Sequence, residues 1–561
     1  MTPIGPSPSG GPGRVRVVDL KPEAELRDEV RRYFPHREVR KYQADLSNRL
    51  YEVLHHDDAV AVEAPTGLGK TAAVGAAVRA YAEKTKTKIL WLTRTAAQCR
   101  HVAAELPGFL PFYGRRLLCL HEAVSKIEQR RFNAACRATR LAGRCPYWPG
   151  RPRALRAVAV KELREAGLRT ATCPYEHQLA ALPASPCVAA THRQLGLIGW
   201  LLARWRVGKD GVLLVLDEAQ HIVNQALSMV RDSISLTTLE RAAREARRWG
   251  FEPLAAELER AVRGYAEASA STDEAEVEDL LPDLHELMEV GQEVQERKLK
   301  SGFVPSSYLL SVADFKAALG GGRPLLVREG RKAQLIALGD PVEELKRVLE
   351  GWRKVVLMSA TVDVVLIEAL LRREITLLRA GWPFEPDALR AIPVRGLTTK
   401  FERRDETLYK DVSWLISVLP RGSLAFLPSH EMVARVRAEG VLKEERGMSQ
   451  EEIERLLQGQ NAEKLIAVLG GRLSEGIDLR APVVALVGIP FAPPTPRTKM
   501  LVEKLKSLMG DERRAHVHGV ILPAVFSAVQ AAGRAVRGPG DRALVLMVDD
   551  RYKPLTRFLP R

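Results

Sequence analysis

The sequence predicts an α/β protein built on parallel, doubly wound sheets. Short apolar runs of strand length recur along the chain, a polar or glycine-rich turn follows each, and a stretch with helical periodicity comes next. This alternation is typical of parallel sheets, because a parallel strand usually returns through a helical crossover. The chain has 561 residues, more than one core organises, so we expect two large domains with insertions.

The first α/β set begins with a helical pattern at residues 39–54 and an apolar strand at residues 59–63. A glycine-rich turn follows, and helix resumes from Ala72. Further strands of this set are expected at residues 89–93, 212–216 and 355–358. A second set is expected to contain strands at residues 423–427, 465–469, 483–487 and 543–548.

Two segments interrupt this rhythm. The first is rich in cysteine and arginine, and the second repeats Leu, Ala, Arg and Glu as an ordinary helical domain with solvated charged faces would. The N-terminal stretch of Gly, Pro and Ser cannot bury apolar surface and is expected to be disordered. The predicted division is 1–13 for this tail, 14–100 with 187–222 and 323–361 for the first α/β domain, 101–186 and 223–322 for the insertions, and 362–561 for the second α/β domain.

Composition restricts the class of protein. A formal charge of +16 and a pI near 9.6 favour a polyanionic partner such as nucleic acid. No apolar run reaches the roughly 18 residues that span a bilayer, and a signal peptide is not evident, so we expect a cytoplasmic protein with no membrane partner. The low number of Asn, against abundant Arg and Glu, is typical of a thermophilic source.

A phosphate-binding loop is predicted between the first strand and the helix that follows it, in the sequence Ala64-Pro65-Thr66-Gly67-Leu68-Gly69-Lys70-Thr71. Backbone N–H groups at the helix start would cradle phosphates, Lys70 would reach the outer ones, and Thr71 would hold Mg²⁺. Ala64 stands where the first Gly is usual. The alternative is a tight turn without a ligand, but the strand and helix on either side favour a nucleotide.

Two carboxylates follow the apolar strand at residues 212–216, in what we call the acidic box, Asp217-Glu218-Ala219-Gln220. Asp217 suits Mg²⁺, and Glu218 suits activation of an attacking water. Alone, this pair would indicate a solvated turn. Together with the phosphate loop upstream, it predicts the second half of a nucleotide site.

The arginine motif lies near the far end of the chain and reads Gln530-Ala531-Ala532-Gly533-Arg534-Ala535-Val536-Arg537. A helix would aim Arg534 and Arg537 at one anion, and both could act as arginine fingers on a γ-phosphate. A basic solvated helix face is the alternative, and without the other motifs it would be preferred.

Taken in order, these motifs resemble those of superfamily 2 helicases, and among them the XPD-type iron–sulfur DNA helicases. Ser359-Ala360-Thr361 and Gly476-Ile477-Asp478 also fall in the family's order, and the similarity runs from about Phe34 to Tyr552. The resemblance implies two RecA-like motor domains, the first carrying an inserted iron–sulfur domain and an inserted helical arch domain. It also implies a monomeric, DNA-stimulated ATP hydrolase that travels 5′ to 3′ on DNA and acts in DNA repair.

The resemblance assigns further residues. Those implied to be catalytic are Lys70, Asp217, Glu218, Gln220, Gln530, Arg534 and Arg537. Those implied to contact the nucleotide, besides the phosphate loop, are Phe34, Arg40, Gln43, Gly476 and Asp478. Those implied to contact DNA are Thr93, Arg94, Thr191 and His192. The implied partners are single-stranded and forked DNA, together with single-strand-binding and repair proteins.

One departure from the family concerns Gln220. The family ends its acidic box with His, whereas this chain has Gln220 followed by His221. The family residue couples hydrolysis to the second domain. Because a Gln amide can still hydrogen-bond across a cleft, we expect hydrolysis to survive, and the departure bears on the strength of that coupling.

Four of the six cysteines lie in the first insertion: Cys119, Cys136, Cys145 and Cys173. In a cytoplasm they are expected to be metal ligands or buried thiols rather than disulfides. Their spacing alone leaves zinc, an iron–sulfur cluster and plain buried thiols open. Leu118-Cys119-Leu120-His121 and Cys173-Pro174-Tyr175 are similar to the first and last cluster motifs of the XPD type, so the resemblance implies a [4Fe–4S] cluster. Cys99 and Cys187 are expected to be core residues.

The first insertion is also basic. Between Gly114 and Cys173 it has fourteen Lys or Arg and four acidic residues, interleaved with aromatic rings. This pattern suits a single strand, with charges along the phosphates and rings stacked on bases, although it also suits a surface kept soluble by charge. Other readings of the whole chain are a DinG-like or RNA-directed helicase of the same iron–sulfur group, or a non-enzymatic DNA-binding metal or redox sensor.

Overall fold

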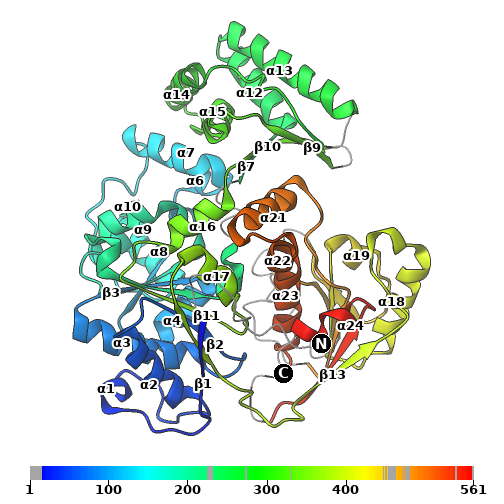
Figure 1. The fold of residues 1–561 in the computed structure, drawn as a ribbon. Coiled ribbons are helices and arrows are strands. Elements are labelled where there is room, and N and C mark those ends of the chain that lie inside the picture. The colour runs from blue at the N-terminus through cyan, green and yellow to red at the C-terminus, as the bar shows by residue number, and fades with distance from the viewer. Residues whose placement is uncertain are drawn as a thin grey trace. The chain divides into compact units, whose positions relative to one another are not determined.

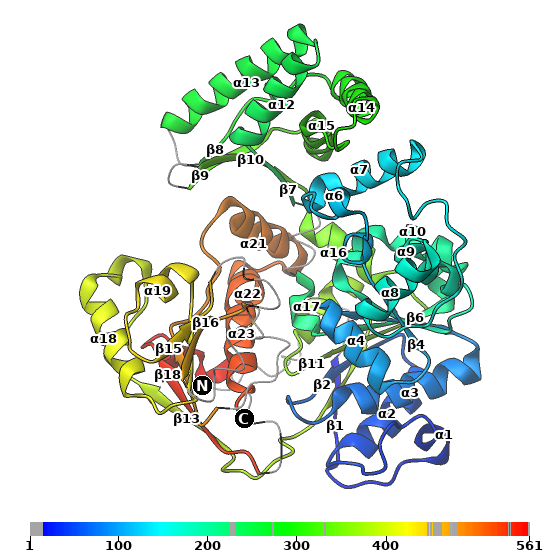
Figure 2. The same ribbon diagram turned by 180° about the vertical axis from the view of Figure 1, so that it is seen from behind.

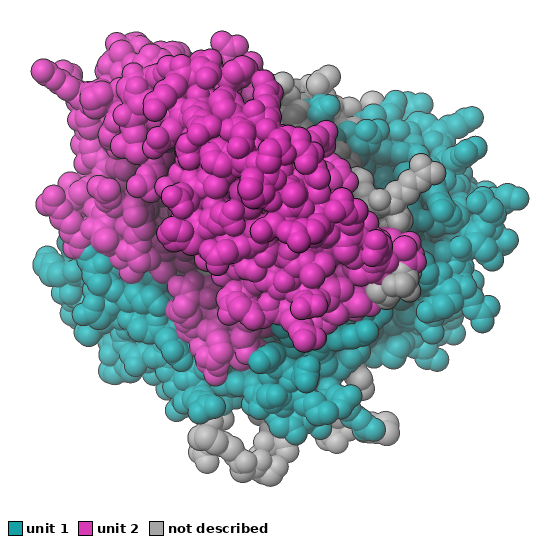
Figure 3. Space-filling view, turned by 90° about the horizontal axis from the view of Figure 1, so that it is seen from above, with its two compact units in different colours: residues 1–108, 207–222, 348–561 teal, residues 109–206, 223–347 magenta. Residues whose placement is uncertain are grey.

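The computed structural model describes residues 15–223, 231–271, 274–329, 332–445, 463–471, 481–536 and 540–558, together with Met448, Glu452, Leu473 and Gly538. The chain divides into two compact units, which Figure 3 shows in different colours. The first unit comprises residues 1–108, 207–222 and 348–561, and the second comprises residues 109–206 and 223–347. The predicted disordered tail lies outside the described residues.

The first unit contains two parallel sheets (Figures 1 and 2). The strands that this unit contributes to its first sheet are, in spatial order, β1 (Val15–Asp19), β12 (Ile375–Arg379), β2 (Ala59–Glu63), β11 (Lys354–Ser359), β6 (Val212–Asp217) and β3 (Lys88–Thr93). Every neighbouring pair among them is parallel. The predicted strands at 59–63, 89–93, 212–216 and 355–358 are confirmed, and their near-continuous apolar runs match strands buried on both faces.

Helices lie between these strands along the chain. They are α1 (Asp28–Arg31), α2 (Gln43–Leu54), α3 (Lys70–Thr85), α4 (Ala96–Glu105) and α17 (Val364–Leu371). Helix α2 contacts β2 and β12, and both α3 and α4 contact β3. The helix predicted from residue 39 begins only at Gln43, because Tyr42 at its N-terminus has a left-handed backbone with φ of 69°.

The second sheet is also parallel, with the order β13 (Leu389–Val394), β18 (Ala543–Val548), β17 (Val483–Val487), β14 (Leu424–Leu427), β16 (Lys464–Val468) and β15 (Val441–Lys443). Its four predicted strands are confirmed to within a residue at either end. The described helices beside it are α18 (Glu406–Val418), α19 (His430–Arg435), α21 (Pro496–Met509), α22 (Glu512–His516), α23 (Leu522–Ala532) and α24 (Tyr552–Leu555).

Alternate residues of each strand in the second sheet enter different cores. In β14, Leu424 and Phe426 pack in the core that contains α23, whereas Ala425 and Leu427 pack in the core that contains α18 and α19. Successive side chains of a strand point to opposite faces, so helices cover both faces of this sheet.

The second unit combines helices with two small groups of strands. Strands β4 (Phe109–Phe112) and β5 (Cys187–Thr191) are parallel neighbours. The helices between them and directly after β5 are α5 (Arg115–Leu118), α6 (Glu122–Ser125), α7 (Gln129–Leu141), α8 (Val160–Thr170), α9 (Pro174–Ala181) and α10 (Ile198–Trp205). An antiparallel sheet follows, in the order β7 (Arg231–Ser235), β10 (Lys332–Leu338), β9 (Leu325–Glu329) and β8 (Glu274–Glu276).

Four helices share one core with this antiparallel sheet: α12 (Leu236–Arg248), α13 (Glu252–Ser271), α14 (Leu284–Lys300) and α15 (Tyr308–Leu319). In Figure 1 they gather on one side of the sheet. The sequence predicted helix alone in residues 223–322 and placed residues 323–361 in the first α/β domain. The structure instead adds strands there, and β9 and β10 belong to this sheet. Strands β7 and β8 contain few apolar residues, so they lack a strong alternating pattern.

A second difference concerns the start of the second α/β domain, which was predicted at residue 362. Strand β12 pairs with β1 and β2, and α17 contacts β1 and β12, so this part of the chain still belongs to the first sheet. The second sheet begins with β13. A turn after Thr361 resembles a domain boundary in the sequence, but the chain crosses back once more before it leaves the first sheet.

One helical stretch, Glu512–Ala532, is long and apolar enough by length and composition alone to cross a membrane. The expectation that no such run exists is therefore wrong by this measure. The stretch comprises α22, a π-helical turn (Val517–Ile521) and α23. Half of the most apolar 18-residue part of this stretch is buried, and α23 supplies part of the core beside the second sheet. Its apolar composition is therefore that of a core helix.

Candidate functional site

The phosphate loop follows β2 and leads into α3, as predicted. Gly67 and Gly69 have φ of 82° and 85°, a region that favours glycine, and Gly69 is the N-cap of α3. The Lys70 ammonium donates to the carbonyl oxygens of Ala64 at 2.9 Å and Pro65 at 3.1 Å. Lys70 therefore folds over the loop, where an incoming phosphate would compete for it.

Gln43 supports this loop from α2. Its amide Nε2 donates to Leu68 O at 2.9 Å and to Gly69 O at 3.4 Å, while its Oε1 accepts from the Arg40 backbone N–H at 2.8 Å. Arg40 also reaches Gly67 O at 3.4 Å. The structure thus brings Arg40 and Gln43 to the phosphate loop, and Phe34 is buried.

The acidic box follows β6, at the carboxyl edge of the first sheet. Asp217 Oδ1 accepts from the Glu218 backbone N–H at 2.9 Å. Glu218 has φ of 53°, a left-handed conformation that is uncommon for a residue other than glycine and that collects at functional sites. Asp217 ends a strand and Glu218 has a left-handed backbone, so the two neighbouring side chains leave the chain in different directions and can take different roles.

The pKa values of the two carboxyl groups shift in opposite directions. Burial and the charge of Glu218 raise the pKa of Asp217 to about 7, against the pull of Lys70. Burial also opposes ionisation of Glu218, but the Gln220 hydrogen bond and the positive charge of Lys70 outweigh it and lower its pKa. Glu218 is thus held as a carboxylate, as a group that takes a proton from water must be.

A chain of polar contacts passes through Glu218 and joins the two sheets of this unit. Glu218 Oε2 accepts from Gln220 Nε2 at 2.8 Å and from Gln530 Nε2 at 2.5 Å. The Ser359 hydroxyl, at the end of β11, donates to Gln220 Oε1. Gln530 lies on α23, beside the second sheet. Both of these Gln220 bonds lie at the edge of the first sheet, and Gln530 makes the contact that reaches the second sheet. A hydrogen bond from Gln220 across the cleft stays a prediction.

The arginine motif also touches the phosphate loop. The Thr66 hydroxyl donates to Gly533 O at 2.8 Å, and Gly533 leaves room for this approach because it lacks a side chain. Arg534 is 5% exposed, and its charge lowers the pKa of Glu218. The structure thus brings Gln530 and Arg534 to the acidic box, whereas Arg537, Gly476 and Asp478 lie outside the described residues.

The four residues implied to contact DNA differ in their surroundings. Thr93 is fully buried, and its hydroxyl donates to Thr95 O at 3.0 Å, while His192 is 2% exposed. Thr191 and Arg94 are half-buried. As placed, Thr93 and His192 offer little side-chain surface to a strand, and contact with DNA through them stays a prediction.

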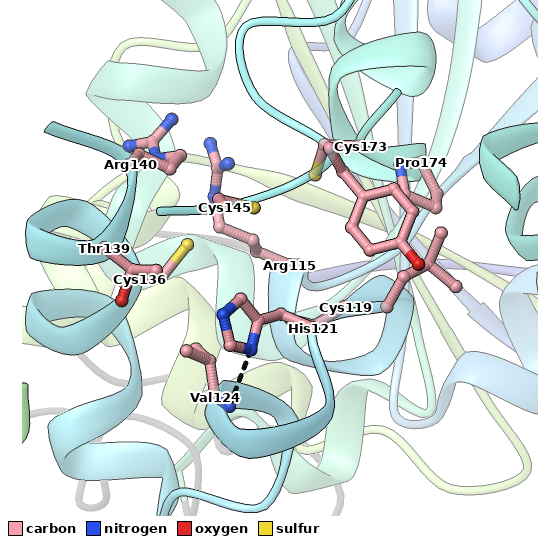
Figure 4. Close-up of a pocket in the computed structure, with 12 residues that line it drawn as sticks. Arg115, Cys119, His121, Val124, Cys136, Thr139, Arg140, Cys145, Cys173 and Pro174 are labelled. Atoms are coloured by element: carbon pink, nitrogen blue, oxygen red, sulfur yellow. Dashed lines mark hydrogen bonds between the residues drawn. The ribbon is translucent and has the colours of Figure 1, made fainter. Parts of the chain in front are cut away.

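The four cysteines of the first insertion surround one pocket (Figure 4). They come from separate segments: Cys119 ends α5, Cys136 lies on α7, Cys145 lies in the following loop, and Cys173 is the N-cap of α9. Figure 4 shows Cys136, Cys145 and Cys173 turned toward the same space. Residues far apart in sequence thus converge, as the ligands of a shared group would.

Two arginines also line this pocket. Arg115 donates to Glu176 at 2.8 Å and lies 4.0 Å over the Tyr175 ring, while Arg140 lies 4.6 Å over the Trp148 ring. Burial raises the pKa of all four thiols, to about 11 for Cys119. The arginines oppose this shift at Cys136, Cys145 and Cys173. The pocket therefore holds neutral thiols but supplies cations for an anionic thiolate group.

Sequence reasoning missed several residues of these sites. Arg115 and Arg140 were counted only as part of a basic segment, and their place at the pocket follows from the convergence of α5 and α7. His518, in the π-helical turn, lies 2.8 Å from Asp363 at the N-terminus of α17 and adds another link between the two halves of the first unit. No motif marks that pair.

Two family models and several known proteins match this chain. The DEAD_2 family matches residues 81–239, and the helicase C-terminal domain family matches residues 412–559. The ATP-dependent DNA helicase XPD of Sulfolobus acidocaldarius is 23% identical over 561 residues, covering 92% of this chain and 97% of that protein. The ATP-dependent DNA helicase CHL1 of Yarrowia lipolytica is 23% identical over 563 residues, covering 78% and 69%.

A solved XPD helicase structure has the same fold. It superposes with a TM-score of 0.73 at 21% identity, covering 95% of this chain and 97% of that one. The predicted α/β class with two parallel motor sheets is thereby confirmed.

Proposed function

The chain belongs to the XPD-type helicases of superfamily 2, and on that premise we propose that it is an ATP-dependent DNA helicase that hydrolyses ATP where the phosphate loop, the acidic box and the arginine motif meet. The observation that carries this proposal is the contact of Gln530 and Gly533 with Glu218 and Thr66. It brings residues from both sheets to one phosphate site, and a motor needs such an arrangement to turn hydrolysis into movement.

Each group has a chemical role in this reaction. The phosphate-loop amides and Lys70 bind the phosphates, and Thr71 and Asp217 would hold Mg²⁺, which neutralises phosphate charge when bound. Glu218 takes the proton of the attacking water. Arg534 approaches from the second sheet and would stabilise the charge that develops on the transferred phosphoryl group.

Replacing Arg534 tests this assignment. Arg534→Ala should lower kcat of the DNA-stimulated ATPase by about a hundredfold or more, because a transition-state arginine contributes that much or more to phosphoryl transfer. Its KM for ATP should change much less. Arg542→Ala, at an exposed arginine paired with Asp387, is the matched control. If both variants keep wild-type turnover, Arg534 has no role in hydrolysis.

On this proposal the substrate is single-stranded and forked DNA, along which the protein travels 5′ to 3′ as a monomer in the cytoplasm. Single-strand-binding and repair proteins are its expected partners. The charge of +16 supports a polyanionic substrate. The names of the relatives support DNA rather than RNA, and XPD and CHL1 alike are named as DNA helicases.

We further propose that the cysteine pocket holds a [4Fe–4S] cluster, with Cys119, Cys136, Cys145 and Cys173 as ligands. The cluster would supply a rigid, redox-active core that ties the insertion together. Four thiolates on one Zn²⁺, each about 2.3 Å from the metal, would lie within about 4 Å of one another. The described side chains form no such tight group, although all four line the pocket. Convergence of the four thiols on one pocket supports a shared group, and the resemblance to the XPD type favours the cluster over a single ion.

Metal content decides between iron and zinc. Protein purified without oxygen should be brown and contain about four iron atoms per chain. Cys136→Ser should lose this iron, whereas Cys187→Ala, which removes a buried thiol outside the pocket, should retain it. Stoichiometric zinc in the anaerobic protein would contradict the cluster.

The cluster proposal also predicts a separation of two activities. The pocket and the nucleotide-binding residues lie in different compact units, so loss of a cysteine should unfold the insertion and spare the nucleotide site. Cys136→Ser is therefore expected to keep much of its DNA-stimulated ATPase and to lose strand separation. Unwinding at the wild-type rate by this variant would show that the cluster is dispensable.

A further inference from the structure

Arg94 has surroundings that a residue bound to the DNA backbone would not need. It directly follows β3 and is half-buried. Its Nη1 lies 3.5 Å from His221 Nε2, and its Nη2 donates to Gly470 O at 3.3 Å. Both ends of the guanidinium therefore face protein groups.

These two partners belong to different halves of the motor. His221 ends the short 3-10 turn Ala219–His221 that follows Glu218, at the edge of the first sheet. Gly470 lies in the turn directly after β16 of the second sheet and has φ of 72°. Arg94 thus joins the acidic box to a turn of the second sheet through one planar group.

The charge of Arg94 is directed at the hydrolytic residues. Burial lowers its pKa, and the negative charge of Glu218 partly offsets that shift. A guanidinium remains a cation under such conditions, and its fork can hold two partners at fixed geometry. To contact a DNA phosphate, the side chain would have to give up His221, Gly470 and the field of Glu218.

From this geometry we propose that Arg94 is a positioning residue that links the acidic box to the Gly470 turn and so couples ATP hydrolysis to the relative movement of the two sheets. It is not a DNA-backbone contact. This inference rests on the proposed helicase function and specifies how the same site is regulated. When the Gly470 turn shifts, Arg94 passes the movement to His221, which lies three residues after Glu218 in the chain.

The salt dependence of DNA binding distinguishes a positioning role of Arg94 from a contact with the DNA backbone. Binding of a fluorescent single-stranded oligonucleotide is measured without nucleotide over a range of salt concentrations. Loss of one phosphate contact reduces the slope of log affinity against log salt by about 0.7 for a single strand. Arg94→Ala is expected to keep the wild-type slope and to bind within about twofold. Arg100→Ala, at an exposed arginine on α4, controls for the change in net charge.

ATPase kinetics supply the second readout. Arg94→Ala should lower the DNA-stimulated kcat by about tenfold or more, as loss of hydrogen bonds from a charged group does, with the KM for ATP and the DNA concentration for half-stimulation little changed. Arg94→Lys keeps the charge but lacks the fork, so it should be as slow as Arg94→Ala. If a thermal melt shows that Arg94→Ala is not folded, Arg94→Lys takes its place in both measurements.

Three results would overturn the inference. The first is weaker DNA binding with a shallower salt slope in Arg94→Ala, which would make Arg94 a backbone contact. The second is rescue of turnover by Arg94→Lys, which would show that charge alone matters. The third is wild-type turnover in both variants. A wild-type protein without DNA-stimulated ATPase would instead contradict the proposed function, so the two failures are distinguishable.

Discussion

A methyl group at Gly533 is expected to disrupt the approach of α23 to the phosphate loop. A Cβ placed on Gly533 would lie 2.5 Å from Thr66 Oγ1 and 3.6 Å from Thr66 Cβ. The φ of Gly533 is −67°, which any residue adopts, so Gly533→Ala tests space rather than backbone strain.

The size of the effect follows from that distance. Carbon and oxygen rarely approach closer than about 3.3 Å, so the Thr66 hydroxyl must turn away and lose its bond to Gly533 O. That bond contributes about 1 kcal/mol, and crowding in a packed contact costs a further ~1–3 kcal/mol. A total of about 2 kcal/mol or more lowers the rate by roughly 30-fold.

The assay is steady-state ATPase with saturating single-stranded DNA, on four proteins that form a double-mutant cycle. Thr66→Ala removes the atom that the new methyl group meets, and alone it should cost about fivefold through the lost hydrogen bond. The double variant Thr66→Ala/Gly533→Ala should return to about the rate of Thr66→Ala. Removing the Thr66 side chain would then relieve the loss of rate that Gly533→Ala causes alone, so the two effects would not add. If Gly533→Ala keeps the wild-type rate, or if Thr66→Ala brings no relief, the contact is absent from the working enzyme.

Other substitutions test the remaining roles at the same site. Lys70→Ala should abolish ATP hydrolysis and shift Tm by only a few degrees, because the Lys70 ammonium donates to carbonyl oxygens of the loop and does not pack in a core; ATPase and a thermal melt on one preparation measure both. Glu218→Gln should bind ATP with near wild-type affinity and slow its cleavage severely, since an amide cannot take a proton, as single-turnover kinetics will show. Gln220→His should raise the ratio of DNA-stimulated to basal ATPase, because it restores the family's coupling residue.

Each of these predictions has an outcome that would contradict it. Unchanged turnover in Lys70→Ala would remove the phosphate-loop assignment. Collapse of ATP affinity in Glu218→Gln would make that carboxylate structural. An unaltered ratio in Gln220→His would show that the departure from the family's residue is neutral.

The sequence predicted the motor sheets well because their strands are apolar throughout. Strands such as β6 and β17 are buried on both faces, so their residue types alone mark them. In the sheet β7-β10-β9-β8, the strands β7 and β8 were missed because they contain few apolar residues. In β7, Arg231-Asp232-Ser233-Ile234-Ser235 offers a single large apolar side chain.

The candidate site was predictable where residue chemistry is local and unpredictable where it depends on folding. The phosphate loop and acidic box each carry their own signal, since Gly67 and Gly69 follow a strand and Asp217 ends one. The link from Arg94 to Gly470 joins residues 376 positions apart, and no local pattern reports it. The resemblance indicated DNA for Arg94, whereas the folded chain gives its guanidinium other partners.

Strand separation is the activity that a DNA helicase must have. Wild-type protein, Lys70→Ala and Cys136→Ser are given labelled DNA duplexes with a 5′ tail, a 3′ tail or no tail, with and without ATP, beside RNA duplexes of the same sequence. We expect that only the wild type separates strands, that it needs ATP, and that it acts on the DNA duplex with the 5′ tail. No unwinding of any DNA by a wild-type protein that hydrolyses ATP would contradict the helicase function, and a preference for the 3′ tail would contradict its direction.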